Sequence, residues 1–264
     1  MIRSRRYVVW AGSVAACLAA ICIQSAHAQF GPLLSPAQAP QAQSPEELDA
    51  YLEIITSRDA STTIKKADFF SSQYAQSQLL GIALQYEMVA YSQLDDLDGV
   101  LRAGETALQL QPGNLHTLLT LASYIPTRVA GRKDADKLLK HAEDYAREAL
   151  SGIDRTKISR EIPLNDWEIR KQEMQSEAHE ALGQVALERN QLPVAVSELE
   201  TAIKVSPVPK GSQFLCLGVA YAKAGQKERA QRTLRRASEA GPDVVRKLAE
   251  DESAKLTNGG HAPR

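Results

Sequence analysis

The sequence predicts an all-α protein made of repeated helix pairs. Ala and Leu are abundant, and runs of β-branched residues or hairpin dipeptides are scarce, which favours helix over strand. Two segments of the second half, 176–207 and 211–242, carry the same residue types in the same slots 35 residues apart, and each ends on a proline. Proline stops a helix because it lacks a donor and clashes with the preceding turn. We therefore expect an α–α superhelix, a solenoid of about five helix pairs with a C-terminal capping helix.

The shared slots have a size pattern that a pair of helices needs. The first helix carries a large apolar residue followed by glycine, and the second carries alanines, so the two helices can approach closely. A third segment, 81–114, fits in its second half, although Met88 takes the usual glycine slot and Gly104 the usual large one. We assign these residues to repeat packing: Tyr91, Ala107, Pro112, Leu182, Gly183, Ala195, Ala202, Pro207, Leu217, Gly218, Tyr221, Ala230, Ala237 and Pro242.

This pattern resembles the tetratricopeptide repeat (TPR), which has 34 residues, two antiparallel helices and a closing proline, and the chain looks like an exported bacterial member of that class. The expected organisation is a repeat domain over 44–256, with pairs at about 44–74, 78–112, 115–151, 165–207 and 211–242, and a cap at 243–256. A basic insertion at 127–134, a polar connector at 151–164 and an unusually long first helix in the fourth pair depart from the pattern. Residues 257–264 should be a disordered tail.

Residues 1–28 have the features of an export signal. Arg3, Arg5 and Arg6 precede an uncharged apolar run over 7–23, and Ala26 and Ala28 occupy the positions that signal peptidase reads, so cleavage is expected before Gln29. Seventeen residues are the lower limit for crossing roughly 30 Å of hydrocarbon, and we expect no membrane span after cleavage. Residues 29–43, rich in Pro, Gln and Ala, should be a linker.

Two other interpretations of the first segment stay open. Residues 14–17, Val-Ala-Ala-Cys, resemble a bacterial lipobox, which would leave Cys17 lipidated and the protein anchored to a membrane. The apolar run continues six residues beyond Cys17, whereas a lipobox normally closes it. The Ser-Arg-Arg sequence at 4–6 also resembles a twin-arginine signal. The expected location is the periplasm, with a lipoprotein or an extracellular protein as alternatives.

Composition and charge argue against several classes of function. The formal net charge is −1, and the part after residue 28 would carry −4 because the signal contains three arginines and no acid. A mildly acidic chain without a basic cluster is not expected to bind nucleic acid. Cys216 would be the sole cysteine left after cleavage, which excludes an intramolecular disulfide and favours a buried apolar role.

No motif in the sequence predicts catalysis, a metal or a cofactor. There is no His-Glu-x-x-His, no Cys-x-x-Cys, no glycine-rich phosphate loop and no Gly-x-Ser-x-Gly elbow. His179 and Glu180 begin like a zinc-protease motif, but the second histidine is missing. An enzyme would need polar groups such as His116, His179 and Glu180 to converge in space.

The TPR resemblance implies an inner surface lined by the first helix of each pair. The Lys, Asn and Arg set with which some TPR domains clamp a chaperone's terminal carboxylate is absent from the matching slots. The remaining candidates are polar and mixed in charge, which suits an extended peptide bound mainly by shape. We therefore expect a non-enzymatic scaffold or adaptor of the bacterial periplasm or envelope, or alternatively a structural lipoprotein, with an unknown protein or peptide partner. The candidate exposed contacts are Gln85, His116, Glu180, Gln184, Glu188, Gln213 and Lys223.

Overall fold

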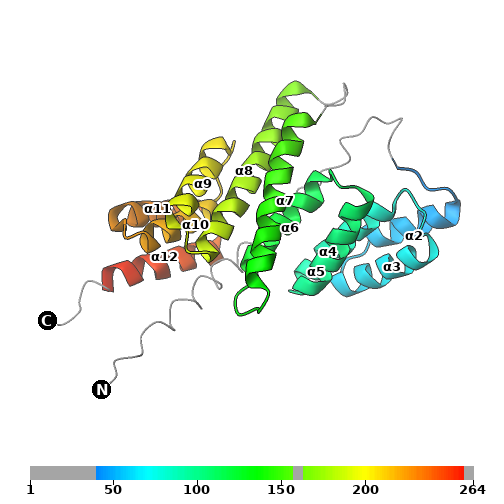
Figure 1. The fold of residues 1–264 in the computed structure, drawn as a ribbon, viewed down its shortest axis with the longest axis horizontal. Helices are drawn as coiled ribbons and strands as arrows, with labels where there is room; N and C mark the ends of the chain where they lie inside the picture. The colour runs from blue at the N-terminus through cyan, green and yellow to red at the C-terminus, as the bar shows by residue number, and fades with distance from the viewer. Residues whose placement is uncertain (1–39, 157–162, 259–264) are drawn as a thin grey trace, which may run out of the picture.

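The structure is a computed structural model that describes residues 40–156 and 163–258. Within these ranges every regular element is a helix, so the all-α prediction is confirmed (Figure 1). The elements in chain order are α2 (Pro45–Ile55), α3 (Ala60–Gln73), α4 (Leu80–Gln93), α5 (Leu97–Leu110), α6 (Leu115–Tyr124), the 3-10 turn η3 (Ile125–Thr127), α7 (Ala135–Arg155), α8 (Leu164–Glu188), α9 (Leu192–Val205), α10 (Gly211–Lys223), α11 (Lys227–Ala240) and α12 (Asp243–Asn258).

In the described part of the chain, the helices pack as five successive pairs followed by the cap α12. The pairs are α2 with α3, α4 with α5, α6 with α7, α8 with α9, and α10 with α11. The second helix of each pair also contacts the first helix of the next, and α11 contacts α12. Because each pair touches its neighbours along the chain, the fold is a linear array of the solenoid kind. We call α4, α6, α8 and α10 the inner helices, and α5, α7, α9 and α11 the outer helices.

Side-chain caps start four of the helices at the places where the chain has to change direction. Ser44, Asp59, Asp96 and Asn114 each accept a hydrogen bond from the backbone N–H three residues later, at 2.9 to 3.1 Å. These bonds satisfy a donor that would otherwise lack a partner in the first helical turn. Local sequence thus explains where these four helices begin.

Glycine at the crossing of two helices permits close packing, as the repeat pattern predicted. A Cβ on Gly183 of α8 would lie 2.5 Å from Leu199 Cγ of α9. A Cβ on Gly218 of α10 would lie 2.8 Å from Leu234 Cγ of α11. Both distances are far shorter than a van der Waals contact. The glycine slot therefore sets the distance between the two helices in the fourth and fifth pairs.

The turn between the two helices of a pair has the same backbone conformation in three pairs. Asp95, Asn190 and Gly225 have φ values of 60°, 56° and 73°, and each lies two residues beyond the end of an inner helix. This left-handed region suits glycine and is tolerated by Asn and Asp. The equivalence of Asn190 and Gly225 agrees with the alignment of their two repeats in the sequence.

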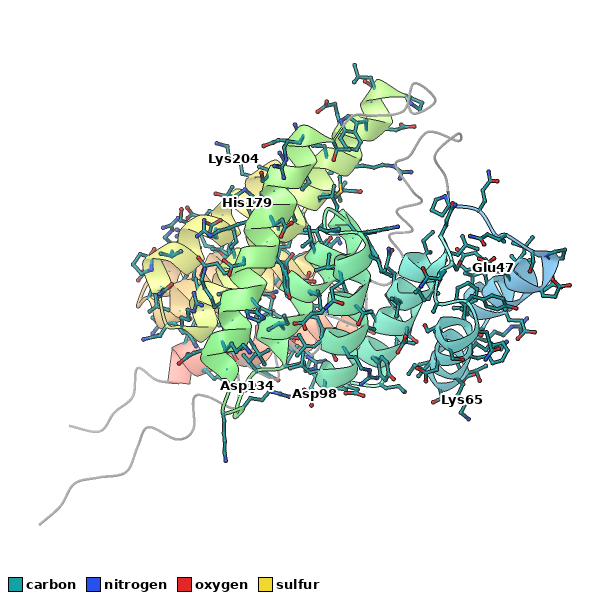
Figure 2. The ribbon with its side chains drawn as sticks, turned by 45° about the vertical axis from the view of Figure 1, so that its right-hand side comes forward. Glu47, Lys65, Asp98, Asp134, His179 and Lys204 are labelled. Carbon is teal, nitrogen blue, oxygen red and sulfur yellow. The ribbon has the colours of Figure 1, made fainter. Side chains whose placement is uncertain are left out.

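The basic insertion in the third pair is tied to the turn of the second pair. Helix α6 ends before Pro126, and α7 begins at Ala135, so the insertion lies where the sequence predicted it. Arg128 forms an ion pair with Asp95. Arg132 lies 3.0 Å from Asp98 and 2.8 Å from Asp134, and the two acids lie near each other in Figure 2. These contacts balance much of the positive charge of the loop.

The prediction of a polar connector over 151–164 is wrong in its first part, because α7 continues to Arg155. Its buried stripe of alanines extends to Ile153, which packs in a cluster with Trp167 and Met174 of α8. This apolar contact between the two helices supports the extra turn, so α7 and α8 project together beyond their neighbours (Figure 1). The remainder of the connector, 157–162, lies outside the described residues.

Several predictions about the chain ends also fall outside the described residues. The signal segment with Cys17, the linker up to residue 39 and the tail from residue 259 belong to this group. Residues 257 and 258, assigned to the tail, are the last two of α12. In 40–156 and 163–258, no helix combines the length and apolar character that a membrane span requires.

Candidate binding surface on the inner helices

A stripe of polar side chains runs along one face of the long inner helix α8. Its members are separated by four, three, four and four residues, a spacing that places all of them on the same side of a helix. Glu173 is exposed, the other three glutamates are half-buried, and the glutamine is 2% exposed. We call this set the α8 stripe; it consists of Glu173, Glu177, Glu180, Gln184 and Glu188.

The α8 stripe faces the next inner helix, α10. The side-chain amide nitrogen of Gln184 lies 3.8 Å from Cys216 Sγ and 3.5 Å from Glu180 Oε1. Glu180 also hydrogen-bonds the side chain of Gln213 at the start of α10. Cys216 itself is buried, as the sequence predicted. The stripe therefore follows the border between two successive inner helices.

Burial raises the pKa of three carboxyl groups in the stripe. It raises the pKa of Glu180 to about 7, while Lys210 and the hydrogen bond from Gln213 act in the opposite direction and Glu177 adds to the rise. Burial also raises the pKa of Glu177, again opposed by Lys210. In each case the loss of water around the carboxylate disfavours its charged form more than the nearby lysine favours it.

The same effect operates at the end of α8. Burial raises the pKa of Glu188, and Lys223 at the end of α10 opposes it. These two residues were both candidates from the sequence, and Lys223 acts electrostatically on Glu188. The end of the stripe thus interacts with a candidate of the next repeat.

Two of the candidate contacts are not exposed, which corrects the prediction. Gln184 and Gln213 are 2% and 3% exposed. The side-chain oxygen of Gln213 accepts a hydrogen bond from the Lys210 backbone N–H at 3.0 Å, and its amide nitrogen donates to Ser176 Oγ at 2.8 Å. Ser176 in turn donates to the Ala202 carbonyl at 2.8 Å. Gln213 thus links the start of α10 to the middle of α8 and, through Ser176, to the end of α9.

The remaining candidates lie on earlier inner helices. Gln85 on α4 and His116 on α6 are both half-buried, and burial lowers the pKa of His116. Sequence reasoning missed Glu173 and Glu177 as members of the surface. The regular spacing of polar residues along the long helix was the signal that could have identified them.

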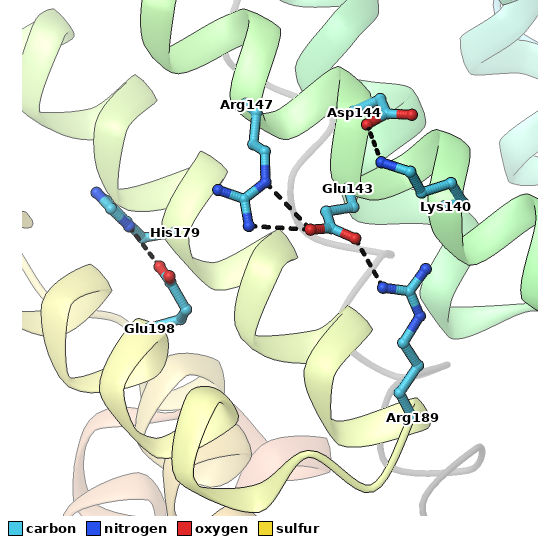
Figure 3. Close-up of polar contacts among 7 residues, drawn as sticks. All are labelled: Lys140, Glu143, Asp144, Arg147, His179, Arg189 and Glu198. Atoms are coloured by element: carbon cyan, nitrogen blue, oxygen red, sulfur yellow. Dashed lines mark hydrogen bonds and ion pairs between the residues drawn. The ribbon is translucent and has the colours of Figure 1, made fainter.

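His179 and Glu180, which a catalytic site would need side by side, contact different helices. His179 Nδ1 lies 2.7 Å from Glu198 Oε2 on the outer helix α9 (Figure 3), whereas Glu180 faces α10. Across the described ranges, the structure contains no group of three or more His, Cys, Asp or Glu side chains arranged to hold a metal ion. The polar side chains of the α8 stripe are arranged in a line along the helix.

An ion-pair network fixes α8 against the preceding outer helix. Glu143 of α7 contacts Arg147 at 2.9 Å and Arg189, at the end of α8, at 2.7 Å (Figure 3). The hydrogen bond from Arg189 lowers the pKa of Glu143, and Arg147 adds to this effect. Because this carboxylate joins two helices, it helps to hold the α8 stripe in position.

Comparison with known proteins supports the fold. No family model matches the chain, and no curated protein sequence matches it. The crystal structure of a thermophilic TPR protein from Thermus thermophilus is similar, with a TM-score of 0.54 and 14% sequence identity over 80% of this chain and 98% of that one. At this identity the likeness concerns the fold alone. The chain is thus a TPR-like helical protein.

Proposed function

We propose that this chain is a non-enzymatic adaptor of the bacterial periplasm or envelope that binds a protein or extended peptide on its inner helices. The observation that supports this most is the α8 stripe, in which half-buried polar groups line the border between two inner helices. Helical arrays use such extended surfaces for binding, because each repeat adds side chains along one direction.

Site-specific photo-crosslinking tests the binding surface. A photoreactive phenylalanine derivative replaces Glu177 on the inner surface, and a control replaces exposed Glu148 on the outer helix α7. In cells, we expect a reproducible covalent adduct with another protein from position 177 and a much weaker one from position 148. Adducts of equal yield from both positions, or none from position 177, would contradict binding at the inner helices.

The export part of the proposal is supported by the sequence of residues 1–28. The intact mass of protein purified from the cell envelope tests it. We expect a chain that begins at Gln29. A chain that begins at a diacylated Cys17 would instead support the alternative, a structural lipoprotein of an envelope assembly. A full-length chain would contradict both.

A further inference from the structure

We propose that the α8 stripe is a subsite for cationic side chains, so that the bound segment of the partner is extended and carries Lys or Arg. This inference deepens the proposed function and depends on it, because it names the chemistry of the ligand at the same surface. It follows from the pairing, spacing and hydrogen bonding of the stripe.

Within 40–156 and 163–258, the glutamates of the stripe lack the ion pairs that neighbouring acids have. Glu143, Glu198 and Glu200, on adjacent helices, each have an Arg or His nitrogen within 4 Å. Among the described residues, no Lys, Arg or His nitrogen lies within 4 Å of a carboxylate oxygen of the stripe. Half-buried carboxylates without a cation are unfavourable, and a cation from a ligand would compensate them.

A buried acceptor within the stripe points independently to a donor from outside. The side-chain oxygen of Gln184 has no hydrogen-bond partner among the described residues, although the side chain is 2% exposed. Its amide nitrogen lies 3.5 Å from Glu180 Oε1, so the amide group adjoins that carboxylate. A buried acceptor left without a donor is unfavourable, because it has lost its hydrogen bonds to water. Lys and Arg side chains carry only donors and can therefore donate hydrogen bonds to both the Glu180 carboxylate and the Gln184 side-chain oxygen.

The raised pKa values have the same physical origin. Burial disfavours the charged forms of Glu177, Glu180 and Glu188, and the lysines that oppose it, Lys210 and Lys223, do not fully compensate. A ligand cation would lower these pKa values and be held more tightly by the ionised carboxylates.

The spacing of the stripe fits an extended chain better than a metal ion. Glu173 and Glu188 are fifteen positions apart in the α-helix, a rise of about 22 Å, which is the length of roughly seven extended residues. Carboxylates one turn apart are separated by about 5–6 Å. Alternate side chains of an extended peptide are separated by about 6–7 Å. We therefore expect cationic residues at every second position of the bound segment.

Fluorescence anisotropy with defined peptides tests the charge preference. The probe is a labelled nine-residue peptide with Arg at alternate positions and Ser between them, and the comparison peptides carry Glu or Gln in place of Arg. We expect the purified protein to bind the Arg peptide roughly tenfold or more tightly than the other two at low salt, where charge contacts are least screened. Equal binding of the three peptides would overturn the proposal.

Two double variants locate the binding. Glu177→Gln with Glu180→Gln neutralises the middle of the stripe, and Glu148→Gln with Glu239→Gln removes two exposed acids from the outer helices α7 and α11. Both variants replace two carboxyl groups by amides of nearly the same size. We expect the first to weaken binding of the Arg peptide roughly tenfold and the second to leave it within about twofold. Equal effects of the two variants would contradict binding at the stripe.

A charge reversal keeps the test informative if the first variant folds poorly. Glu177→Lys should shift the preference from the Arg peptide towards the Glu peptide, and circular dichroism checks that the fold is retained. An unchanged preference in the folded variant would contradict the assignment.

The crosslinking experiment separates this inference from the proposed function. Mass spectrometry of the adduct formed at position 177 identifies the captured segment. A segment with alternating Lys or Arg supports both proposals. A neutral or acidic segment leaves the adaptor function standing and overturns the cationic subsite. Tight binding of the Arg peptide without any adduct in cells supports the subsite and counts against the adaptor function.

Discussion

Met88 of α4 occupies the space that Gly104 of α5 leaves open. A Cβ on Gly104 would lie 2.8 Å from Met88 Sδ and 2.8 Å from Leu121 Cδ2. In the fourth pair the sizes are reversed, because Gly183 on the inner helix meets Leu199 on the outer one. The two arrangements use positions sixteen residues apart in each pair. The second pair therefore keeps the packing of the repeat with the large side chain moved to the other helix.

Exchanging the large and the small side chain between positions 88 and 104 should largely preserve the stability of the helix pair. Gly104→Leu alone should lower the free energy of unfolding by about 1–3 kcal/mol through overpacking. Met88→Gly alone should lower it by roughly 2–5 kcal/mol through the cavity that it leaves. The double variant recreates the glycine and leucine of the fourth pair, so its loss should be smaller than the sum. Urea unfolding measures all three, and strictly additive losses would contradict the exchange.

The junction of the last pair tolerates no side chain at Gly211. A Cβ there would lie 2.4 Å from the Cα of Gly241, so two backbones are in direct contact and neither can move aside. Gly211→Ala should lower the free energy of unfolding by about 3 kcal/mol. Gly113→Ala is the matched control, because no atom of the part of the chain that the structure describes lies within 4 Å of the added Cβ. Similar urea midpoints for the two variants would rule out this close contact.

Glu87 should make stability depend on pH. Burial raises the pKa of Glu87 to about 7; Asp68 adds to this rise, and Arg102 and a hydrogen bond with Tyr91 oppose it. The folded state therefore holds the proton more tightly than the unfolded state, whose carboxyl titrates near 4.5. The stabilisation is complete below pH 4.5 and is lost as pH rises through about 7.

Glu87→Gln should remove this part of the pH dependence. The free energy of unfolding of the variant, relative to that of the parent, should rise by on the order of 1–3 kcal/mol from pH 4 to pH 8. Urea unfolding at the two pH values measures the difference. The control is Glu148→Gln, on the exposed surface of α7, which should leave the dependence unchanged. An identical pH profile for Glu87→Gln and the parent would count against a proton held at Glu87.

The left-handed backbone conformation after α8 should restrict which residues are tolerated at position 190. Asn190 has φ of 56°, and its side chain is exposed, so packing contributes little there. Asn190→Val should lower the free energy of unfolding by about 1–2 kcal/mol, since a Cβ-branched side chain is strained in this conformation. Asn190→Gly, which matches Gly225 in the next pair, should be close to neutral. Equal losses for Val and Gly would indicate a contact of the Asn side chain rather than the backbone.

The repeat architecture was predictable from sequence because it depends on size at a fixed period. Gly183 and Gly218 lie where only a hydrogen fits, and Ala195 and Ala230 lie on the buried side of the outer helices. Each of these constraints concerns a helix and its neighbour in the chain, so it recurs with the repeat. The long first helix of the fourth pair was predictable for the same reason, from its uninterrupted helical spacing.

The extent of α7 and the chemistry of the inner surface depended on the tertiary structure. Helix α7 continues because Ile153 meets Trp167, which follows it in the sequence after the intervening segment. Gln184 and Gln213 look like surface residues in a helical pattern, yet both are buried where α10 approaches α8. A polar side chain's burial and charge depend on which helix lies opposite, and the sequence period does not specify that. The sequence by itself determined the helical array and its period, whereas only the packing of α8 against α10 decided which polar groups became a half-buried stripe.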